Sequence, residues 1–271
     1  MSLRIQNNTE AFNVHRQLVG TASFAAKSME RLASGFRINR AADDAAGLAI
    51  SEKLRGQVGG LAQAQRNAGD AVSLVQTAEG ALAEVHSMLG RVRELAVQYK
   101  NGTLSSSDKT AIENEVTALG NEISRIGSDT KFNGITLLAG TPTVTFQVGA
   151  DDSQTIAVTG AALYGAGSSY SVDSAIFTAF STASIANIDS AISNVSTVRA
   201  SFGAVQNRLE HTLNNLAAYE ENLTASESRI RDVDMASEMT KFTKYQILQQ
   251  AGVSMLAQAN AAPQAVLSLL R

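Results

Sequence analysis

Hydrophobic residues recur at helical spacing near both ends of this 271-residue chain. Toward the C-terminus one stripe, at steps of three and four residues, comprises Leu248, Ala251, Met255, Ala259, Ala262, Val266 and Leu269. Within residues 1–40, where we expect a first helix, a second stripe comprises Ala11, Val14, Leu18, Ala22, Ala25, Met29, Leu32 and Phe36. Such stripes are typical of helices that pack on other helices. We therefore expect the two ends of the chain to pair as one coiled coil.

A longer helical pattern follows Gly35 and Asn39, which interrupt the first. Asp43 and Asp44 suit the first turn of a new helix, where carboxylates complement the positive helix end. Steps of three and four then predict one helix of some 55 residues, roughly 80 Å long. Its seam is expected at Leu54, Val58, Leu61, Gln65, Ala68, Val72, Val75, Ala78, Leu82, Val85, Leu89, Val92, Ala96 and Tyr99.

The middle of the chain changes period twice. After Asn101-Gly102, Ser107 or Asp108 is expected to cap a helix that folds back antiparallel on the long one, with its apolar positions at Ile112, Val116, Leu119, Ile123 and Ile126. Asn133-Gly134 predicts a hairpin turn, and alternation on both sides of residues 149–153 predicts a second hairpin. From near Ile185 to Leu223 the helical spacing returns.

These elements define the expected fold class: mainly α, a long antiparallel helical bundle or coiled coil with small β-hairpins and paired N- and C-terminal helices. We divide the chain into a terminal-helix coiled-coil domain (1–42 plus 230–271), a helical rod domain with hairpins (43–159 plus 184–229), and a connection (160–183). That connection is rich in Gly, Ser and Thr, and it is expected to be short, variable and exposed.

Composition and charge exclude several classes. A net charge of −3 argues against a nucleic-acid binder, which usually carries a basic patch. Aromatic residues make up only 5% of the chain and Trp is absent, as expected for long helices packed through small side chains. No Cys is present, so disulfides and thiolate metal sites are excluded. Neither an apolar N-terminal signal segment nor an 18-residue apolar run occurs, so we expect no cleaved signal and no membrane insertion.

A search for catalytic chemistry yields no site. The three histidines, His15, His86 and His211, fall on three different predicted helices without a second ligand at metal-binding spacing. Motifs for zinc proteases, nucleotide binding and serine nucleophiles are all absent. The paired carboxylates at 43–44 and 151–152 are explained by helix-start and turn roles. We predict no enzyme activity, no cofactor and no metal.

One stretch of the long helix, Leu89–Gln98, has apolar character outside the seam. Arg91 and Leu95 lie four residues apart and share a face beside the central line. Two interpretations are open: a flank of the coiled coil, or a contact surface in which Leu95 is exposed between Arg91 and Gln98.

Several motifs stand out together in the first half of the chain: RLASGFRINRAADDAAGLAISEKLRGQ (31–57), QRNAGDAVSLVQTAEGAL (65–82), RVRELAVQ (91–98) and KFNGITLL (131–138). Others lie near its end: SRIRDVDMASEM (228–239), ILQQAGVSMLAQAN (247–260) and the ending VLSLLR. The first set resembles the N-terminal region of bacterial flagellin, and the second set resembles its C-terminal region. The resemblance covers about 1–160 and 185–271. It departs in the middle, where many flagellins insert large outer domains and this chain has only 160–183. Hook–filament junction proteins share the terminal pattern more weakly and are the alternative.

The resemblance implies an extracellular filament subunit for motility, exported unfolded through the flagellar type III apparatus. It also implies an export chaperone on the C-terminal helix, a filament cap, and hook–filament junction proteins as partners. By the same resemblance, Arg91, Leu95 and Glu115 match the family's contact site for a host Toll-like receptor. The residues expected to carry polymerisation are Leu18, Met29, Leu32, Leu248, Met255, Val266 and Leu269.

The energetics of the ends favour order in an assembly. Burying about eight apolar side chains of the C-terminal helix is expected to gain less free energy than ordering some forty residues costs in conformational entropy. We therefore expect both termini to be largely disordered in the monomer and to order among neighbouring copies in an open helical fibre. A membrane-active protein is the alternative from another class, but the ends lack the aromatic and Lys-rich faces typical of such helices. Pro263 is expected to kink or restart the last helix.

Overall fold

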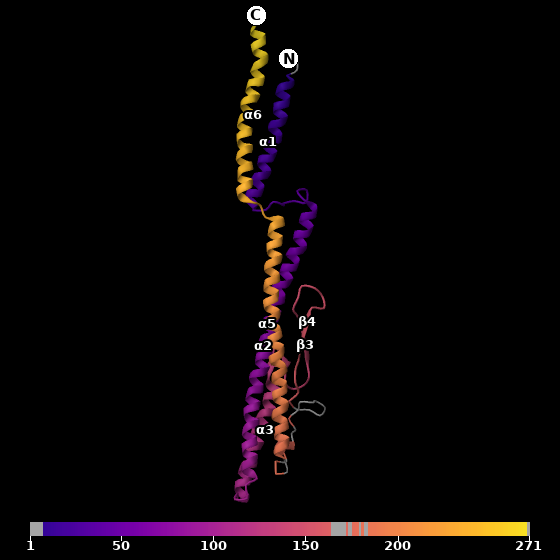
Figure 1. Cartoon of the computed structure of the whole chain (residues 1–271), viewed down its shortest axis with the longest axis vertical. Helices are drawn as coiled ribbons and strands as arrows, with labels where there is room; N and C mark the ends of the chain where they lie inside the picture. The colour runs from indigo at the N-terminus through magenta and orange to yellow at the C-terminus, as the bar shows by residue number, and fades with distance from the viewer. Residues whose placement is uncertain (1–7, 164–171, 173–174, 179, 182–183, 270–271) are drawn as a thin grey trace. The chain divides into compact units, whose positions relative to one another are not determined.

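The structure, a computed structural model, describes residues 8–163, 172, 175–178, 180–181 and 184–269. For Ala175, Thr178 and residues 262–269 it describes the backbone alone. The elements are α1 (Thr9–Ser34), α2 (Ala45–Tyr99), α3 (Ser106–Asp129), β1 (Lys131–Phe132), β2 (Ile135–Thr136), β3 (Thr143–Gln147), β4 (Thr155–Thr159), α4 (Ala175–Thr178), α5 (Ile185–Arg231) and α6 (Met235–Leu269). Figure 1 labels all of them except β1, β2 and α4. The predicted fold class, long helices with two small hairpins and paired terminal helices, is confirmed.

The chain forms two compact units, and the boundary between them falls inside α2 and α5. One unit contains residues 57–221, and the other contains residues 1–56 and 222–271. The predicted domain limits at 42/43 and 229/230 stay a prediction.

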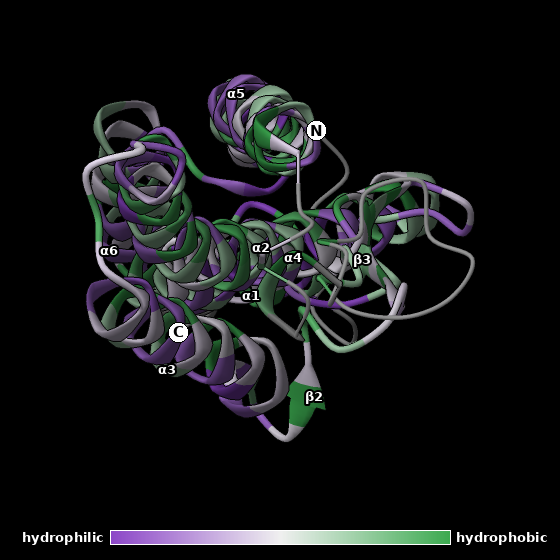
Figure 2. Cartoon of the chain, turned by 90° about the horizontal axis from the view of Figure 1, so that it is seen from below, coloured by the Kyte–Doolittle hydropathy of each residue, from purple (hydrophilic) through white to green (hydrophobic). Residues whose placement is uncertain are grey.

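The core of the 57–221 unit runs along α2, with α3 and α5 packed on it. The seam expected on α2 is buried at most of its positions, from Leu61 through Ala96. Figure 2, coloured by hydropathy, shows hydrophobic and hydrophilic residues side by side on α2, α3 and α5. The core is therefore a narrow layer between long helices, built from one stripe on each.

Helix α3 begins with a complete capping box. Ser105 Oγ accepts from the backbone N–H of Asp108, and Asp108 Oδ2 accepts from the N–H of Ser105 at 3.0 Å. This arrangement satisfies two backbone donors that the first turn otherwise leaves free. The cap predicted at Ser107 is thus wrong by two residues, and Asp108 is the partner of the cap rather than the cap itself.

Two antiparallel hairpins follow α3, as predicted. In β1–β2 the turn residues Asn133 and Gly134 both have positive φ, 47° and 80°, which is the backbone that Asn-Gly hairpin turns require. In β3–β4, Val144 pairs with Val158 and Phe146 with Ile156. This second hairpin packs on α2 and α5 through a small apolar cluster of Ala68, Ala71, Val148, Ile156 and Leu209.

The prediction of an exposed connection over 160–183 is wrong for the side chains that the structure describes there. Most of them are buried: Ala161, Ala162, Leu163, Val172, Ile176, Phe177 and Phe180. The backbone is tied in as well, since the N–H of Leu163 donates to the carbonyl of Leu138. The Gly- and Ser-rich composition concealed enough apolar residues to complete the core beside α3, where Phe177 lies directly against Gly120.

Candidate functional site

Helices α1 and α6 form an antiparallel pair, and this pair is the candidate site (Figure 1). Helix α1 starts after Asn8, whose Oδ1 accepts from the N–H of Ala11 at 3.1 Å. It ends at Gly35, whose φ of 77° lies in the left-handed region that glycine adopts without strain. Helix α6 starts after Asp234, whose Oδ1 accepts from the N–H groups of Ala236 and Ser237. Local caps therefore set both ends of α1 and the start of α6.

Contacts between α1 and α6 occur at successive levels along the pair. The side-chain amide of Asn8 donates to the carbonyl of Ala259 at 2.7 Å. The Phe24 and Tyr245 rings stack with centroids 5.6 Å apart. Leu18 packs on Gly252, where a Cβ would come within 3.1 Å of its Cδ1. As the position on α1 rises, the partner on α6 falls, so the two helices run antiparallel in one register.

The seam of α1 is the one expected from its hydrophobic stripe, with one exception. Ala25 is buried and most other stripe members are half-buried, but Met29 is 56% exposed. Its place in the seam is taken by Ser28, which is buried.

Most of the described part of the expected α6 stripe does not face α1. Leu248, Ala251 and Met255 are exposed, and Ala259 is the one stripe member whose described side chain is shielded. The shielded positions are Glu238, Phe242, Tyr245, Gly252, Leu256 and Ala259. These residues also recur at steps of three, four and seven, so the actual seam is rotated relative to the predicted one. The stripe assignment for α6 is therefore wrong at Leu248, Ala251 and Met255, while the side chains of Ala262, Val266 and Leu269 lie outside the part of the chain that the structure describes.

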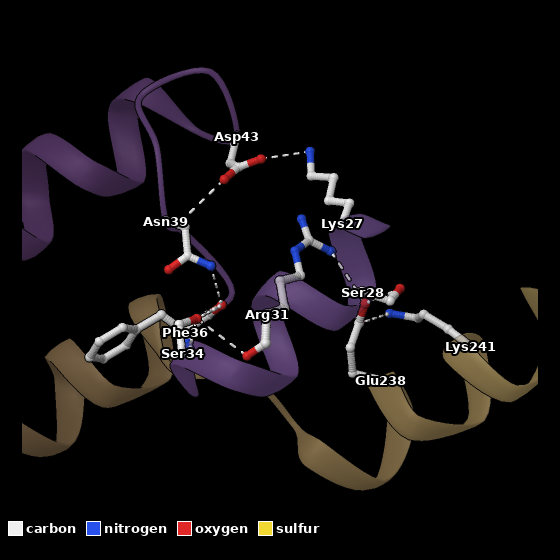
Figure 3. A network of polar contacts seen from close by, with 9 residues as sticks. All are labelled: Lys27, Ser28, Arg31, Ser34, Phe36, Asn39, Asp43, Glu238 and Lys241. Atoms are coloured by element: carbon white, nitrogen blue, oxygen red, sulfur yellow. Dashed lines mark hydrogen bonds and ion pairs between the residues drawn. The ribbon is translucent and has the colours of Figure 1, made fainter. Parts of the chain in front are cut away.

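A polar network around Glu238 closes the pair near its α1 C-terminal end (Figure 3). Glu238 is 3% exposed; its Oε1 accepts from Ser28 Oγ at 2.7 Å and lies 3.8 Å from Arg31 Nη1. Its Oε2 accepts from Lys241 Nζ at 3.1 Å. Burial by itself raises the pKa of Glu238, but the hydrogen bonds from Ser28 and Lys241 and the charge of Arg31 outweigh it, so the pKa is lowered. The carboxylate is therefore held ionised inside the seam.

A second cluster fixes the turn after α1. Asp43 Oδ1 forms an ion pair with Lys27 Nζ at 2.6 Å, and its Oδ2 accepts from the N–H groups of Asn39 and Arg40. The hydrogen bond from Lys27 is the largest cause of a lowered pKa of Asp43, about 2. Asp44 caps α2 by accepting from the N–H of Gly47 at 2.8 Å. The two carboxylates expected to act alike at the helix start thus have different roles, one in the turn and one in the cap.

The segments that follow α1 and α5 pair with each other. The N–H of Arg37 donates to the carbonyl of Arg231 at 2.7 Å, and the N–H of Val233 donates to the carbonyl of Gly35 at 3.0 Å. The Arg231 guanidinium lies over the Phe36 ring, 4.8 Å from its centroid, and also contacts Glu52. These bonds hold the base of the α1–α6 pair at a defined position.

Large apolar side chains remain exposed on the α1–α6 pair. Phe12 is 72% exposed, Ile247 61% and Met255 60%. The others are Val19, Phe24, Met29, Met235, Met239, Leu248 and Val253. Single exposed apolar residues are ordinary on protein surfaces, but a series along both helices of one pair marks an interaction surface. We name these ten residues the exposed apolar set.

Of the residues predicted at the receptor contact, Arg91 and Glu115 are exposed and Leu95 is buried. Arg91 Nε donates to Glu115 Oε1 at 3.0 Å and Arg91 Nη1 donates to Glu94 Oε2 at 3.2 Å, on the exterior of the 57–221 unit. The Glu115 carboxylate is the largest cause of a raised Arg91 pKa. Leu95 is 1% exposed and belongs to the core, so the interpretation of Leu95 as an exposed residue is wrong.

The sequence search missed Asn8, Ser28 and Glu238 because its criterion was hydrophobic periodicity. Glu238 could have been found from its position four residues before Phe242 and seven before Tyr245, on one helical face. Asp151 and Asp152 lie in the exposed β3–β4 turn, as predicted. Among the described residues, no group of three or more His, Asp or Glu side chains is placed to hold a metal ion. The described helices also include none with both the length and the hydrophobicity of a membrane span.

Comparison with known proteins places this architecture in one family. Residues 5–143 match the bacterial flagellin N-terminal helical region, and residues 185–270 match the bacterial flagellin C-terminal helical region. Flagellin of Bacillus subtilis (strain 168) is 49% identical in an alignment over 304 residues, and this alignment covers 99% of this chain and 100% of that protein. The flagellar filament 33 kDa core protein of Treponema phagedenis is 44% identical over 287 residues, covering 98% of this chain and 99% of that protein.

A solved structure shares the fold. The structure described as a putative flagellar hook-associated protein from Vibrio parahaemolyticus aligns with a TM-score of 0.60, 17% identity, and coverage of 70% of this chain and all of that one. At this identity the likeness concerns the fold alone, so it does not favour the junction-protein alternative. The two family regions and the high identity over nearly the whole chain are decisive: the chain belongs to the bacterial flagellin family.

Proposed function

We propose that the α1–α6 pair is the surface through which this flagellar filament subunit polymerises, in a structural role without catalysis. The names of the Bacillus and Treponema relatives, a flagellin and a filament core protein, support the role of filament subunit. The single observation that carries the polymerisation surface is the exposed apolar set on α1 and α6.

The physical argument concerns burial. Within one chain the α1–α6 seam shields small and polar residues such as Ala25, Ser28 and Glu238, while larger apolar side chains remain in water. Covering each of these gains about 1.5–3 kcal/mol. Other copies of the same chain present the same surface, and head-to-tail contacts between copies that do not close produce a fibre.

The predicted polymerisation residues divide into two groups. Met29, Leu248 and Met255 are exposed and would contact neighbouring subunits directly. Leu18 and Leu32 are half-buried within the pair and would hold α1 on α6. Val266 and Leu269 stay predictions, since their side chains lie outside the described part.

We further propose that α1 and α6 are largely disordered in the monomer and become ordered in the filament. A two-helix pair with so few buried residues gains little against the entropy of ordering its backbone. Amide hydrogen exchange on the monomer tests this proposal. Strong protection in residues 9–34 and 240–261 before assembly contradicts it, whereas fast exchange that slows after seeding with filament fragments supports it.

A substitution pair tests the polymerisation surface directly. Ile247→Ser removes an exposed apolar side chain from α6, and Ile135→Ser removes one from β2 in the other unit, where it is 38% exposed. Growth on filament seeds, followed by sedimentation and electron microscopy, is expected to require several-fold more Ile247→Ser monomer than wild type. The Ile135→Ser control is expected to polymerise normally. Equal growth of both variants contradicts the assignment.

The partners of export and assembly are further proposals. A subunit with disordered ends suits unfolded export through the flagellar type III apparatus without a cleaved signal peptide. The apolar face of α6 suits a chaperone that binds a helix in a groove before export. Cap and hook–filament junction proteins would meet the same helices at the filament ends. Binding of the 235–271 segment by a chaperone from the same export system, with loss of binding on Leu248→Ser, tests the chaperone proposal.

Recognition by a host Toll-like receptor is also proposed, at Arg91 and Glu115. Their exposed ion pair supports it, because charged side chains at a surface are accessible to a partner. Leu95 is buried, so it would contribute indirectly, by packing α2 on the core, rather than by contacting the receptor. Receptor activation by monomer is expected to fall with Arg91→Ala and to persist with Arg125→Ala, a matched surface arginine on α3 that pairs with Glu122.

A further inference from the structure

Helix α6 continues through Pro263, although proline has no amide proton to donate. In an α-helix the amide of residue 263 would bond the carbonyl of residue 259. The Ala259 carbonyl therefore lacks the amide donor that the fourth residue after it normally supplies in an α-helix. A backbone acceptor that is left without a partner costs stability wherever it is shielded from water, and Ala259 is half-buried.

The missing donor is supplied from the other end of the chain. Asn8 Nδ2 donates to the Ala259 carbonyl at 2.7 Å, across a separation of 251 residues. The same side chain caps α1, because its Oδ1 accepts from the N–H of Ala11. An amide side chain serves both bonds since it has a donor end and an acceptor end. Among the residues favoured as helix caps, Asp has no donor, and the Ser hydroxyl is too short to span both partners.

We propose that Asn8 is a positioning residue that replaces the amide proton missing at Pro263, so that α6 remains helical beyond Ala259 only where the start of α1 is docked. The proline makes the end of α6 dependent on α1, because the ring nitrogen of Pro263 cannot donate the hydrogen bond that an α-helix would direct to Ala259. The start of α1 and the end of α6 are thereby coupled, and the bond between Asn8 and Ala259 sets the register of the α1–α6 pair. This inference rests on the proposed role of α1 and α6 in assembly.

A double-mutant cycle tests the coupling in full-length filaments. Asn8→Ser keeps a capping oxygen but removes the amide donor, and Pro263→Ala restores a backbone N–H for Ala259. The measurement is the amide exchange rate of residues 264–269, with residues 9–12 as the report on the α1 cap. With Pro263 present, Asn8→Ser is expected to raise exchange of 264–269 about three- to tenfold, as the loss of one hydrogen bond does. With Pro263→Ala, the same substitution is expected to change it by less than about twofold.

A second variant separates shape from hydrogen bonding. Asn8→Asp preserves the size of the side chain and is a good helix cap, but it turns an acceptor toward the Ala259 carbonyl. It is expected to raise exchange at 264–269 at least as much as Asn8→Ser does, and Pro263→Ala is expected to rescue both.

Equal effects of Asn8→Ser in the two backgrounds, or faster exchange confined to residues 9–12, would overturn the proposal and leave Asn8 as a cap only. If wild-type chains fail to grow on seeds, the proposed function is wrong, and the same cycle is then measured on the monomer, where absence of coupling overturns the Asn8 proposal. Filaments that assemble normally but show no coupling would contradict the Asn8 proposal alone.

Discussion

Removing the buried carboxylate of Glu238 is expected to weaken assembly without unfolding the rest of the subunit. Glu238→Ala deletes the acceptor for Ser28 and Lys241 and leaves Arg31 without its nearest opposite charge. Arg31 Nε is already buried without a hydrogen-bond partner. The seam then contains a shielded Ser28 hydroxyl that has lost its acceptor and a guanidinium that has lost its ion-pair partner.

The magnitude follows from the geometry. The short bond from Ser28 to a carboxylate contributes about 1.5–3 kcal/mol. Lys241 is half exposed, so its bond adds about 0–1 kcal/mol. The 3.8 Å contact with Arg31 is long and adds little. A net loss of about 2 kcal/mol per subunit corresponds to roughly a thirtyfold rise in the monomer concentration needed for filament growth.

The assay is seeded growth followed by sedimentation, which gives the critical concentration. Glu238→Gln is the matched control for volume: it retains an oxygen for Ser28 but loses the charge, so a smaller rise of about tenfold or less is expected. Thermal unfolding of the monomer by circular dichroism is expected to be unchanged in both variants. Leu89→Ala, in the core of the other unit, is expected to behave oppositely and lower monomer stability by about 2–5 kcal/mol.

Two outcomes would refute this reasoning. A wild-type critical concentration for Glu238→Ala would show that the network contributes nothing to the pair. A large loss of monomer stability would show that α1 and α6 are already ordered before assembly. Combining Ser28→Ala with Glu238→Ala decides whether their hydrogen bond carries the effect, because the two losses are then expected to be less than additive.

Three further predictions concern the glycines of α1, the turn after α1 and the start of α3. Gly35→Ala, at positive φ, is expected to weaken filaments by about 1 kcal/mol. Gly20→Ala, inside α1 with open space around it, is expected to strengthen them by about 0.5–1 kcal/mol. The critical monomer concentration for filament growth is therefore expected to rise for the first variant and to fall for the second. The lowered pKa of Asp43, about 2 against 3.8, gives stability that is present above pH 4 and is lost between about pH 4 and 2. This contribution of Asp43 to stability amounts to at most about 2 kcal/mol. In an acid titration, filaments of the Asp43→Asn variant are expected not to show this loss of stability between pH 4 and 2. Ser105→Ala removes the α3 cap and is expected to cost about 1 kcal/mol in monomer unfolding, while Ser107→Ala costs less.

Much of the fold was predictable from local patterns. The 55-residue helix, the Asn133-Gly134 turn and the return to helix at Ile185 depend on spacing and turn chemistry within a few residues. Hydrophobic periodicity of α1 also identified its own seam, because its apolar residues are concentrated on one face. The family motifs at both ends of the chain came from the sequence as well.

The orientation of α6 was decided by tertiary structure. Its apolar residues lie on several faces, among them Phe242, Ile247, Val253 and Leu256, so no single stripe is favoured by spacing alone. Leu95 on α2 likewise shows that spacing alone does not identify which residues of a helix are buried. A helix that is covered by both α3 and α5 buries a wider face than one seam, and the residue beside the predicted line is then in the core.

The sequence by itself determined where the helices and turns lie, because helix periodicity, caps and turn residues act over short distances along the chain. Only the tertiary structure decided which faces meet, and it brought Asn8 to Ala259 and Ser28 to Glu238 across more than two hundred residues. Such polar contacts leave no periodic trace, since a single well-placed donor and acceptor suffice once the apolar seam has set the register.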